Sequence, residues 1–185
     1  MIPEKSTVVR NLTTKEKISL VTELRNNAGL WMQHPMNKTA LDSGTSIIIN
    51  WVTHINGNYQ KQWTLREFFP ETWAILESIA EGKEFGKVYW HKLLPGQVAK
   101  PHTDNGNLYI RNGDAYKRYN IFLTVPKDVR MYFDGDLTNL FTLPVAHTLV
   151  DQCATKPHAV FNKSNEEIIV MVIDVMNDNI KVYDD

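Results

Sequence analysis

The chain has 185 residues, and its 20 Lys and Arg against 21 Asp and Glu give a formal net charge of −1. This length suits one domain that can bury enough surface to fold without a disulfide or a structural metal. The charge balance lacks the basic excess typical of nucleic-acid-binding domains, and a single cysteine excludes an internal disulfide framework.

The first half of the chain carries the helix signals. Thr13–Glu16 has capping-box spacing, and apolar residues then recur at helical intervals from Ile18 to Leu24, which predicts a helix. Thr64–Glu67 repeats the capping pattern. Pro70 follows and can open a turn or a second helix through Ala80, with Gly82 as its stop.

The second half reads as short strands separated by turn residues. These segments are rich in β-branched and aromatic residues, and one further strand is expected before the second helix. They are Ser46–Val52, Val88–Leu94, Tyr119–Val125, Val129–Phe133, Thr148–Cys153 and Ile168–Val175. Many short strands without alternating helices favour an antiparallel sandwich or barrel. We therefore expect a mainly β single domain, residues 1–185, in which residues 1–85 brace a β core over residues 86–176.

No apolar run approaches the ~18 residues of a membrane span. The first ten residues carry charges early and lack the apolar core of a signal peptide. Together with the single cysteine, this predicts a cytoplasmic protein with no membrane partner.

One histidine has a neighbour with metal-binding spacing. His102 and Asp104 are two residues apart, so on a strand their side chains share a face and can converge on one ion. His158 is the best candidate for a third ligand, because it precedes a polar turn and the most apolar strand, as expected at a strand start inside a barrel. Two histidines and one carboxylate leave coordination positions open, which suits non-haem Fe(II).

Two longer segments extend this pattern. Tyr89-Trp-His-Lys-Leu-Leu-Pro-Gly-Gln-Val-Ala-Lys-Pro-His102-Thr-Asp104 resembles the first half of the iron site in aspartyl/asparaginyl β-hydroxylase-like 2-oxoglutarate oxygenases. Arg118–Pro126 resembles the next strand of that family, and Pro157–Val175 resembles its distal-histidine hairpin. The similarity covers about residues 86–176.

The resemblance implies a double-stranded β-helix, the jelly roll also found in cupins, with Fe(II) held by His102, Asp104 and His158. It also implies that 2-oxoglutarate chelates the iron and that O2 converts it to succinate while a substrate C–H is hydroxylated. The protein then positions the substrate and excludes side reactions.

One feature departs from the family. Relatives place an arginine after the distal histidine to bind the far carboxylate of 2-oxoglutarate, whereas Asn165–Val172 contains no basic residue. The resemblance points instead to Arg118, where relatives have a co-substrate-facing arginine, with His91 as a further donor. Asn120 shares the face of Arg118 by strand alternation. The alternative for Arg118 is a surface residue at the rim of the barrel.

The connection between the His-x-Asp motif and Arg118 is long. It is either a substrate-covering loop or a plain hairpin. Asn105, Tyr109 and Arg111 flank the metal motif and are the predicted substrate-binding residues.

The predicted function is an Fe(II)/2-oxoglutarate-dependent hydroxylase acting on an amino-acid C–H, free or in a peptide or protein. A cupin-like metalloenzyme that does not use 2-oxoglutarate is the first alternative, and it would explain the missing arginine. A non-catalytic jelly-roll binding module is the second.

Overall fold

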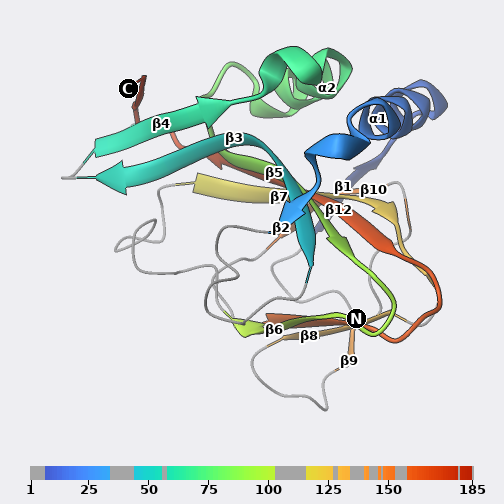
Figure 1. Ribbon diagram of the computed structural model, residues 1–185. Coiled ribbons are helices and arrows are strands. Elements are labelled where there is room, and N and C mark those ends of the chain that lie inside the picture. The colour runs from blue at the N-terminus through green and yellow to red at the C-terminus, as the bar shows by residue number, and fades with distance from the viewer. Residues whose placement is uncertain are drawn as a thin grey trace.

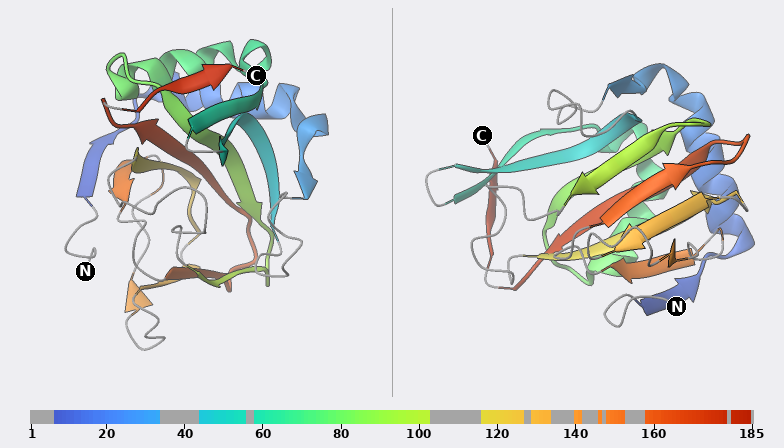
Figure 2. Two further views of the ribbon diagram at one scale, coloured as in Figure 1. Left: turned by 90° about the vertical axis from the view of Figure 1, so that its left-hand side faces the viewer. Right: turned by 90° about the horizontal axis from the view of Figure 1, so that it is seen from below.

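Two α-helices, a large sheet and a small sheet form successive layers (Figure 1). The computed structural model describes residues 7–33, 44–55, 58–102, 116–126, 129–133, 140–141, 146, 148–152, 158–178 and 180–184. Both helices lie on the same side of the large sheet and the small sheet lies on the other, as the left view of Figure 2 shows. None of the helices in these ranges is long and apolar enough to span a bilayer.

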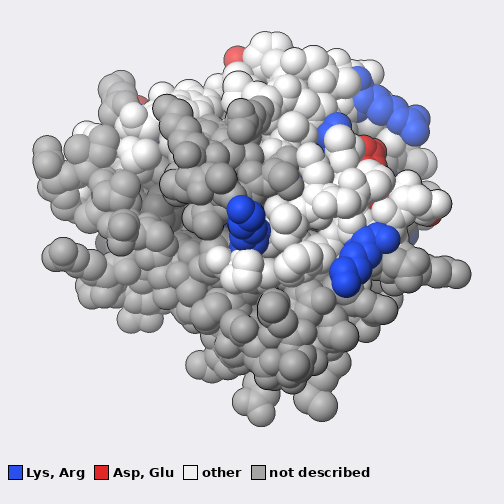
Figure 3. Space-filling view, turned by 60° about the horizontal axis from the view of Figure 1, so that its bottom comes forward, with Lys and Arg blue, Asp and Glu red and all other residues white. Residues whose placement is uncertain are grey.

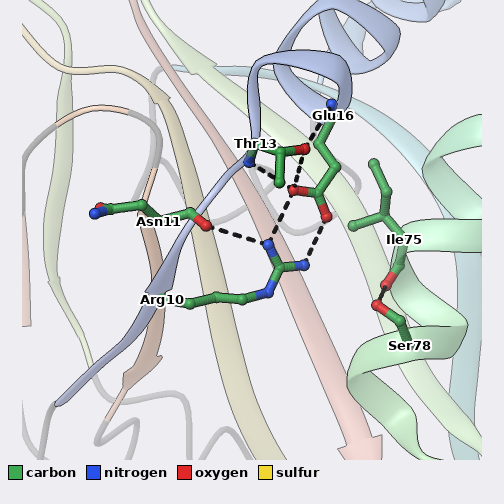
Figure 4. Close-up of polar contacts among 6 residues, drawn as sticks. All are labelled: Arg10, Asn11, Thr13, Glu16, Ile75 and Ser78. Carbon is green, nitrogen blue, oxygen red and sulfur yellow. Dashed lines mark hydrogen bonds and ion pairs between the residues drawn. The ribbon is translucent and has the colours of Figure 1, made fainter.

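The first helix, α1 (Thr14–Asn26), begins at the predicted capping box. Thr13 Oγ1 accepts a hydrogen bond from the backbone N–H of Glu16, and the Glu16 carboxylate accepts one from the N–H of Thr13 (Figure 4). Arg10 adds two hydrogen bonds to the same carboxylate at 3.0 and 2.7 Å. Residues preceding the helix therefore fix its start.

The second helix, α2 (Pro70–Ala80), has a cap that comes from α1 instead of its own sequence. The buried Glu23 carboxylate accepts the backbone N–H groups of Glu71 and Thr72 at 2.6 and 2.7 Å. The predicted second capping box differs from what is seen: Thr64 Oγ1 accepts the N–H of Arg66 at the start of a 3-10 turn, Arg66–Phe68. A further 3-10 turn, Ala28–Leu30, follows α1.

The large sheet contains nine of the strands in the described ranges, in the order β1-β10-β7-β12-β5-β3-β4-β13, with β2 paired to β3. All of these neighbours are antiparallel except β13 and β4, which are parallel. The strands are β1 (Thr7–Asn11), β2 (Met32–Gln33), β3 (Thr45–Ile55), β4 (Asn58–Thr64), β5 (Phe85–Leu93), β7 (Tyr116–Thr124), β10 (Thr148–Gln152), β12 (Ile168–Met176) and β13 (Val182–Asp184).

The small sheet has four strands in the described ranges, in the order β6-β11-β8-β9. They are β6 (Val98–His102), β11 (His158–Asn162), β8 (Val129–Phe133) and β9 (Leu140–Phe141). With the large sheet this gives the antiparallel, mainly β architecture that the sequence predicted. The N-terminal 85 residues supply β1, β2, β3 and β4 to the large sheet as well as the bracing helices.

Two apolar clusters hold the layers together. The larger one lies between the helices and the large sheet and includes Leu20, Leu76 and Trp90, all with 0% of their surface exposed. The second joins the two sheets: Ala99 and Val160 of the small sheet pack with side chains of the large sheet, namely Leu93, Phe122, Ile168 and Val170. The face of the large sheet opposite the helices is therefore the interior of the jelly roll.

One buried side chain ties together the turns that connect the sheets. Asn162, 1% exposed, donates through Nδ2 to the carbonyls of Leu93 and Glu166, while its backbone bonds to Gly96 and Gln97. Gly96 has φ of 79°, the left-handed conformation that glycine adopts without strain. The two crossings from β5 to β6 and from β11 to β12 are thus locked side by side, which sets how β6 and β11 lie against the large sheet.

Candidate active site

The backbone brings two of the predicted metal ligands to one place. β6 and β11 are adjacent antiparallel strands, and His158 is the register partner of His102. Directly opposite positions in an antiparallel pair lie on the same face, with Cβ atoms about 4.5–5.5 Å apart. Two positions that are 56 residues apart in sequence are therefore neighbours in the small sheet. The prediction that His158 stands at a strand start is confirmed.

The face on which these positions lie follows from strand alternation. Val160 is two residues from His158 and belongs to the cluster that fills the space between the sheets. The register shifts between His158 and Val160, where two residues of β11 span three of β6. This irregularity puts the position of His102 on the same inward face as Ala99, three residues before it.

The third predicted ligand, Asp104, lies outside the described residues, as do the side chains of His102 and His158. Among the side chains that the structure describes, no group of three or more His, Cys, Asp or Glu could hold a metal ion. The metal ligands consequently remain a prediction that the backbone register supports.

The interior face of the large sheet carries a polar strip across β5, β12 and β7. Strand register aligns its residues in three rows, each two residues from the next along β12. The rows are His91–Val170–Phe122, Tyr89–Val172–Asn120 and Asp174–Arg118. All three predicted co-substrate residues, His91, Arg118 and Asn120, lie on this strip and are buried.

The imidazole of His91 is held from the neighbouring strand β3. Ser46 is its register partner, and Ser46 Oγ lies 3.0 Å from His91 Nδ1. Gly44 covers the other edge of the ring: a Cβ at position 44 would stand 2.5 Å from Cε1 and 2.7 Å from Nε2. A glycine is therefore needed at position 44 for the ring to lie where it does.

The guanidinium of Arg118 is engaged by a carboxylate on β12. Its Nε and Nη2 donate to the two carboxylate oxygens of Asp174 at 2.7 and 2.9 Å. Arg118 is 8% exposed and Asp174 0%, so this is a buried bidentate pair and not a residue of the surface rim. The rim alternative for Arg118 is wrong because both partners point into the barrel.

His91 and Arg118 are not brought together. Their register partners on β12, Val170 and Asp174, are four residues apart, which is about 13 Å along the strand. The two residues also lie on opposite sides of β12, so their Cα atoms are about 16 Å apart. Asn120 occupies the row between them.

The predicted substrate residues Asn105, Tyr109 and Arg111 lie outside the described residues. Figure 3 turns the small-sheet side of the molecule forward. The Lys and Arg side chains described there are spread over separate places. The described part of this face thus has no basic patch.

Three residues of this strip were missed from the sequence: Gly44, Ser46 and Asp174. A polar Asp174 within the most apolar segment, Ile168–Met176, was an available signal, because a carboxylate is rarely buried without a partner. The partnership of Ser46 with His91 depends on the β3–β5 register, which no local pattern encodes.

Comparison with known protein families identifies the chain. The model of the Aspartyl/Asparaginyl beta-hydroxylase family matches residues 20–178. The chain belongs to this family, and the match extends the resemblance seen over residues 86–176 well into the N-terminal half. The protein is therefore an enzyme of the 2-oxoglutarate-dependent hydroxylase kind. No curated protein sequence matches the chain.

Solved structures of low sequence identity share the fold. An oxidoreductase of the 2OG-Fe(II) oxygenase family from Burkholderia pseudomallei is 15% identical with a TM-score of 0.63, covering 94% of this chain and 85% of that one. A prolyl hydroxylase from Trichoplax adhaerens, in complex with a hypoxia inducible factor oxygen degradation domain peptide fragment, is 11% identical with a TM-score of 0.61, covering 94% and 84%. A Pseudomonas putida prolyl-4-hydroxylase is 17% identical with a TM-score of 0.57, covering 95% and 94%. The double-stranded β-helix expected from the sequence is confirmed.

Proposed function

We propose that this protein uses Fe(II), 2-oxoglutarate and O2 to hydroxylate a C–H of an amino-acid residue in a peptide or protein, or of a free amino acid. The observation that carries the proposal is the register of β6 and β11, which pairs His102 with His158 on the interior side of the small sheet. Family membership supplies the reaction class.

The donor set fits a ferrous ion. Two imidazoles and the carboxylate of Asp104 are ligands of the type and number that non-haem Fe(II) oxygenases use, and they leave positions open for co-substrate and O2. In the proposed site His102 and His158 bind from facing strands, and Asp104 binds from the residues just beyond β6. With O2, the bound iron and 2-oxoglutarate supply the oxidising chemistry.

The chain's own residues position the reactants. The polar strip on the large sheet faces the small sheet across the interior, so its buried side chains are available to bind and orient 2-oxoglutarate and substrate in a space from which the clusters around Phe122 and Ile168 exclude water. We propose that Asn120, in the middle row, contributes such a contact. Asn105, Tyr109 and Arg111 remain the proposed substrate-binding residues.

A peptide or protein substrate is favoured by two findings. The family is named for hydroxylation of aspartyl and asparaginyl residues. The Trichoplax adhaerens neighbour, which shares the fold across nearly all of this chain, is bound to a peptide. The proposal therefore ranks a peptide side chain above a free amino acid.

The first test is metal binding. Anaerobic titration of the whole chain with Fe(II) or Mn(II) should show one equivalent bound, and His102→Ala should abolish stoichiometric binding. His54→Ala, which changes a histidine at the far end of the β3–β4 hairpin, is the control and should bind normally. Unchanged affinity in His102→Ala would remove the central claim. Binding should weaken as pH falls, because both imidazoles must be neutral and the carboxylate ionised.

The second test is the reaction. The iron-loaded protein with ascorbate should convert 2-oxoglutarate to succinate, and mass spectrometry of a peptide library should show products that gain one oxygen. Metal binding without succinate formation and without 2-oxoglutarate binding would favour a cupin-like metalloenzyme, for which the absence of a basic residue from Asn165–Val172 already argues. No metal binding would favour a non-catalytic jelly-roll module.

A further inference from the structure

We propose that Ser46 is a positioning residue that orients the imidazole of His91, and that this imidazole, not Arg118, binds the far carboxylate of 2-oxoglutarate. The inference rests on the proposed function, because it concerns the co-substrate of that reaction. It adds a residue from β3, outside every motif in the sequence, and it changes the partner expected for the carboxylate.

The far carboxylate needs a donor that the chain does not supply in the usual way. Burying a carboxylate without a cation or hydrogen-bond donors is costly. The turn and strand after His158 contain Asn165-Glu-Glu-Ile-Ile-Val-Met-Val172 and no basic side chain. A donor must therefore come from another strand that faces the interior.

Arg118 is poorly suited to this task. Its Nε and Nη2 are directed at both oxygens of Asp174, which has 0% of its surface exposed. Binding a second carboxylate there would bring two anions to one guanidinium in a buried place. The missing arginine would have stood early in β12, and Asp174 lies at the opposite end of that strand.

His91 lies at the end of β12 where a donor is missing. It is the register partner of Val170, inside the stretch that lacks a basic residue. It shares the interior face with Leu93, which packs against the small sheet. The imidazole is thus a hydrogen-bonding group close to the position that the arginine would have served.

Ser46 determines which ring nitrogen carries the proton. Its hydroxyl can donate to Nδ1 of a neutral imidazole or accept from Nδ1–H of an imidazolium, and in both cases Nε2 carries a proton that can be donated to a carboxylate. Ser46 is 0% exposed, so water does not replace it. Gly44 limits rotation of the ring by its close approach to Cε1 and Nε2. Hydroxyl and glycine together hold one orientation.

The test separates the far carboxylate from the rest of the co-substrate. Mn(II)-loaded protein is titrated anaerobically by calorimetry with 2-oxoglutarate and with 2-oxopentanoate, which has a methyl group in place of that carboxylate. Ser46→Ala should weaken 2-oxoglutarate binding about five- to tenfold and leave 2-oxopentanoate binding unchanged. His91→Ala should weaken 2-oxoglutarate about 10- to 100-fold with the same selectivity.

A matched control is available in α2. Ser78→Ala removes a serine hydroxyl that bonds only locally, to the carbonyl of Ile75, and should change neither affinity (Figure 4). In nitrogen-detected NMR of the imidazoles, Ser46→Ala should shift the His91 signals and Ser78→Ala should not.

Three results would overturn the inference. Equal weakening of both 2-oxoacids in Ser46→Ala would mean that Ser46 only supports the structure. Unchanged affinity for both would mean that it does not act on the co-substrate. Loss of 2-oxoglutarate selectivity in Arg118→Met with retention in His91→Ala would return the carboxylate to Arg118. If the unaltered protein binds the metal but not 2-oxoglutarate, the proposed function itself fails, which is distinguishable from all three.

Discussion

The pair between Arg118 and Asp174 shows how a single residue's role depends on its partner across the sheet. Both side chains are almost completely buried, and the two hydrogen bonds satisfy both carboxylate oxygens. The Coulombic attraction in such a pair roughly offsets the cost of removing two charges from water, but removing one partner leaves the other charge buried alone. The pair is therefore expected to matter more when broken than when replaced.

Breaking this pair should destabilise the protein more than removing it. Arg118→Met leaves Asp174 buried without its cation and should lower the free energy of unfolding by about 3–5 kcal/mol. The double variant Arg118→Met/Asp174→Leu should regain most of that loss, because no unpaired charge remains. Urea denaturation followed by tryptophan fluorescence measures both.

The control for this prediction is an exposed pair. Arg66 and Glu77 form a salt bridge with side chains 57% and 54% exposed, so Arg66→Met should cost less than about 1 kcal/mol. A double variant as unstable as Arg118→Met would show that the pair contributes net stability. If the double variant also keeps its affinity for 2-oxoglutarate, a structural role for Arg118 is supported.

At the scale of elements, the helix starts depend on carboxylates in different ways. Glu16 acts within its own capping box and also binds Arg10, whereas Glu23 caps the neighbouring helix α2. Hydrogen bonds from Arg10 lower the pKa of Glu16 to about 2, with the N–H of Thr13 acting in the same direction. The start of α1 is therefore sensitive to acid.

The stability of the protein should fall with pH partly through Glu16. Its folded-state pKa lies below the unfolded value of about 4.3, so its contribution is complete above that value and is lost as pH falls toward 2. Glu16→Gln should be less stable at pH 7, by about 0.5–2 kcal/mol, the usual range for a lost cap. The difference between the two proteins should shrink between about pH 5 and pH 2 in thermal unfolding curves; a constant difference would contradict the assignment.

Local patterns were sufficient for elements with strong patterns. The capping box and periodic apolar residues located α1, and alternating or continuous β-branched residues located β3, β5, β7, β8, β10 and β12 to within a few residues. β4 was missed because Asn58-Tyr-Gln-Lys-Gln-Trp-Thr64 is a polar strand near the sheet edge with no fully buried residue. Strand propensity is weak where burial does not enforce it.

The site was predictable where it rests on spacing and not where it rests on register. His102 and His158 each carried a local signal, and their pairing agrees with the expectation that they face each other. The carboxylate that Arg118 binds lies 56 residues away on β12. A one-residue slip in that register would reverse the faces, so no single segment determines the pair.

At the scale of the whole molecule, the sheet order interleaves the two halves of the chain. β3 lies beside β5, and β1 lies beside β10, so strands from the first 64 residues flank β10, β7, β12 and β5 on both sides. The same region supplies α1 and α2, whose residues Leu20, Leu24, Phe69, Trp73 and Leu76 cover one face of those four strands. The family match, which begins at residue 20, agrees with this interdependence.

A fragment of residues 86–176 should therefore not fold by itself. It keeps the proposed metal ligands and both sheets' central strands, but it would expose two unpaired strand edges and the apolar face that the helices cover. Ser46 would be absent as well. We expect the fragment to aggregate or to lack a cooperative thermal transition, measured by circular dichroism, and to bind Mn(II) without the one-to-one stoichiometry of the full chain. Removing residues 1–6 is the control and should leave the transition in place, because the first described strand begins at Thr7. A fragment that unfolds cooperatively and binds one equivalent of metal would show instead that residues 86–176 are an autonomous oxygenase core to which the N-terminal strands and helices are only appended.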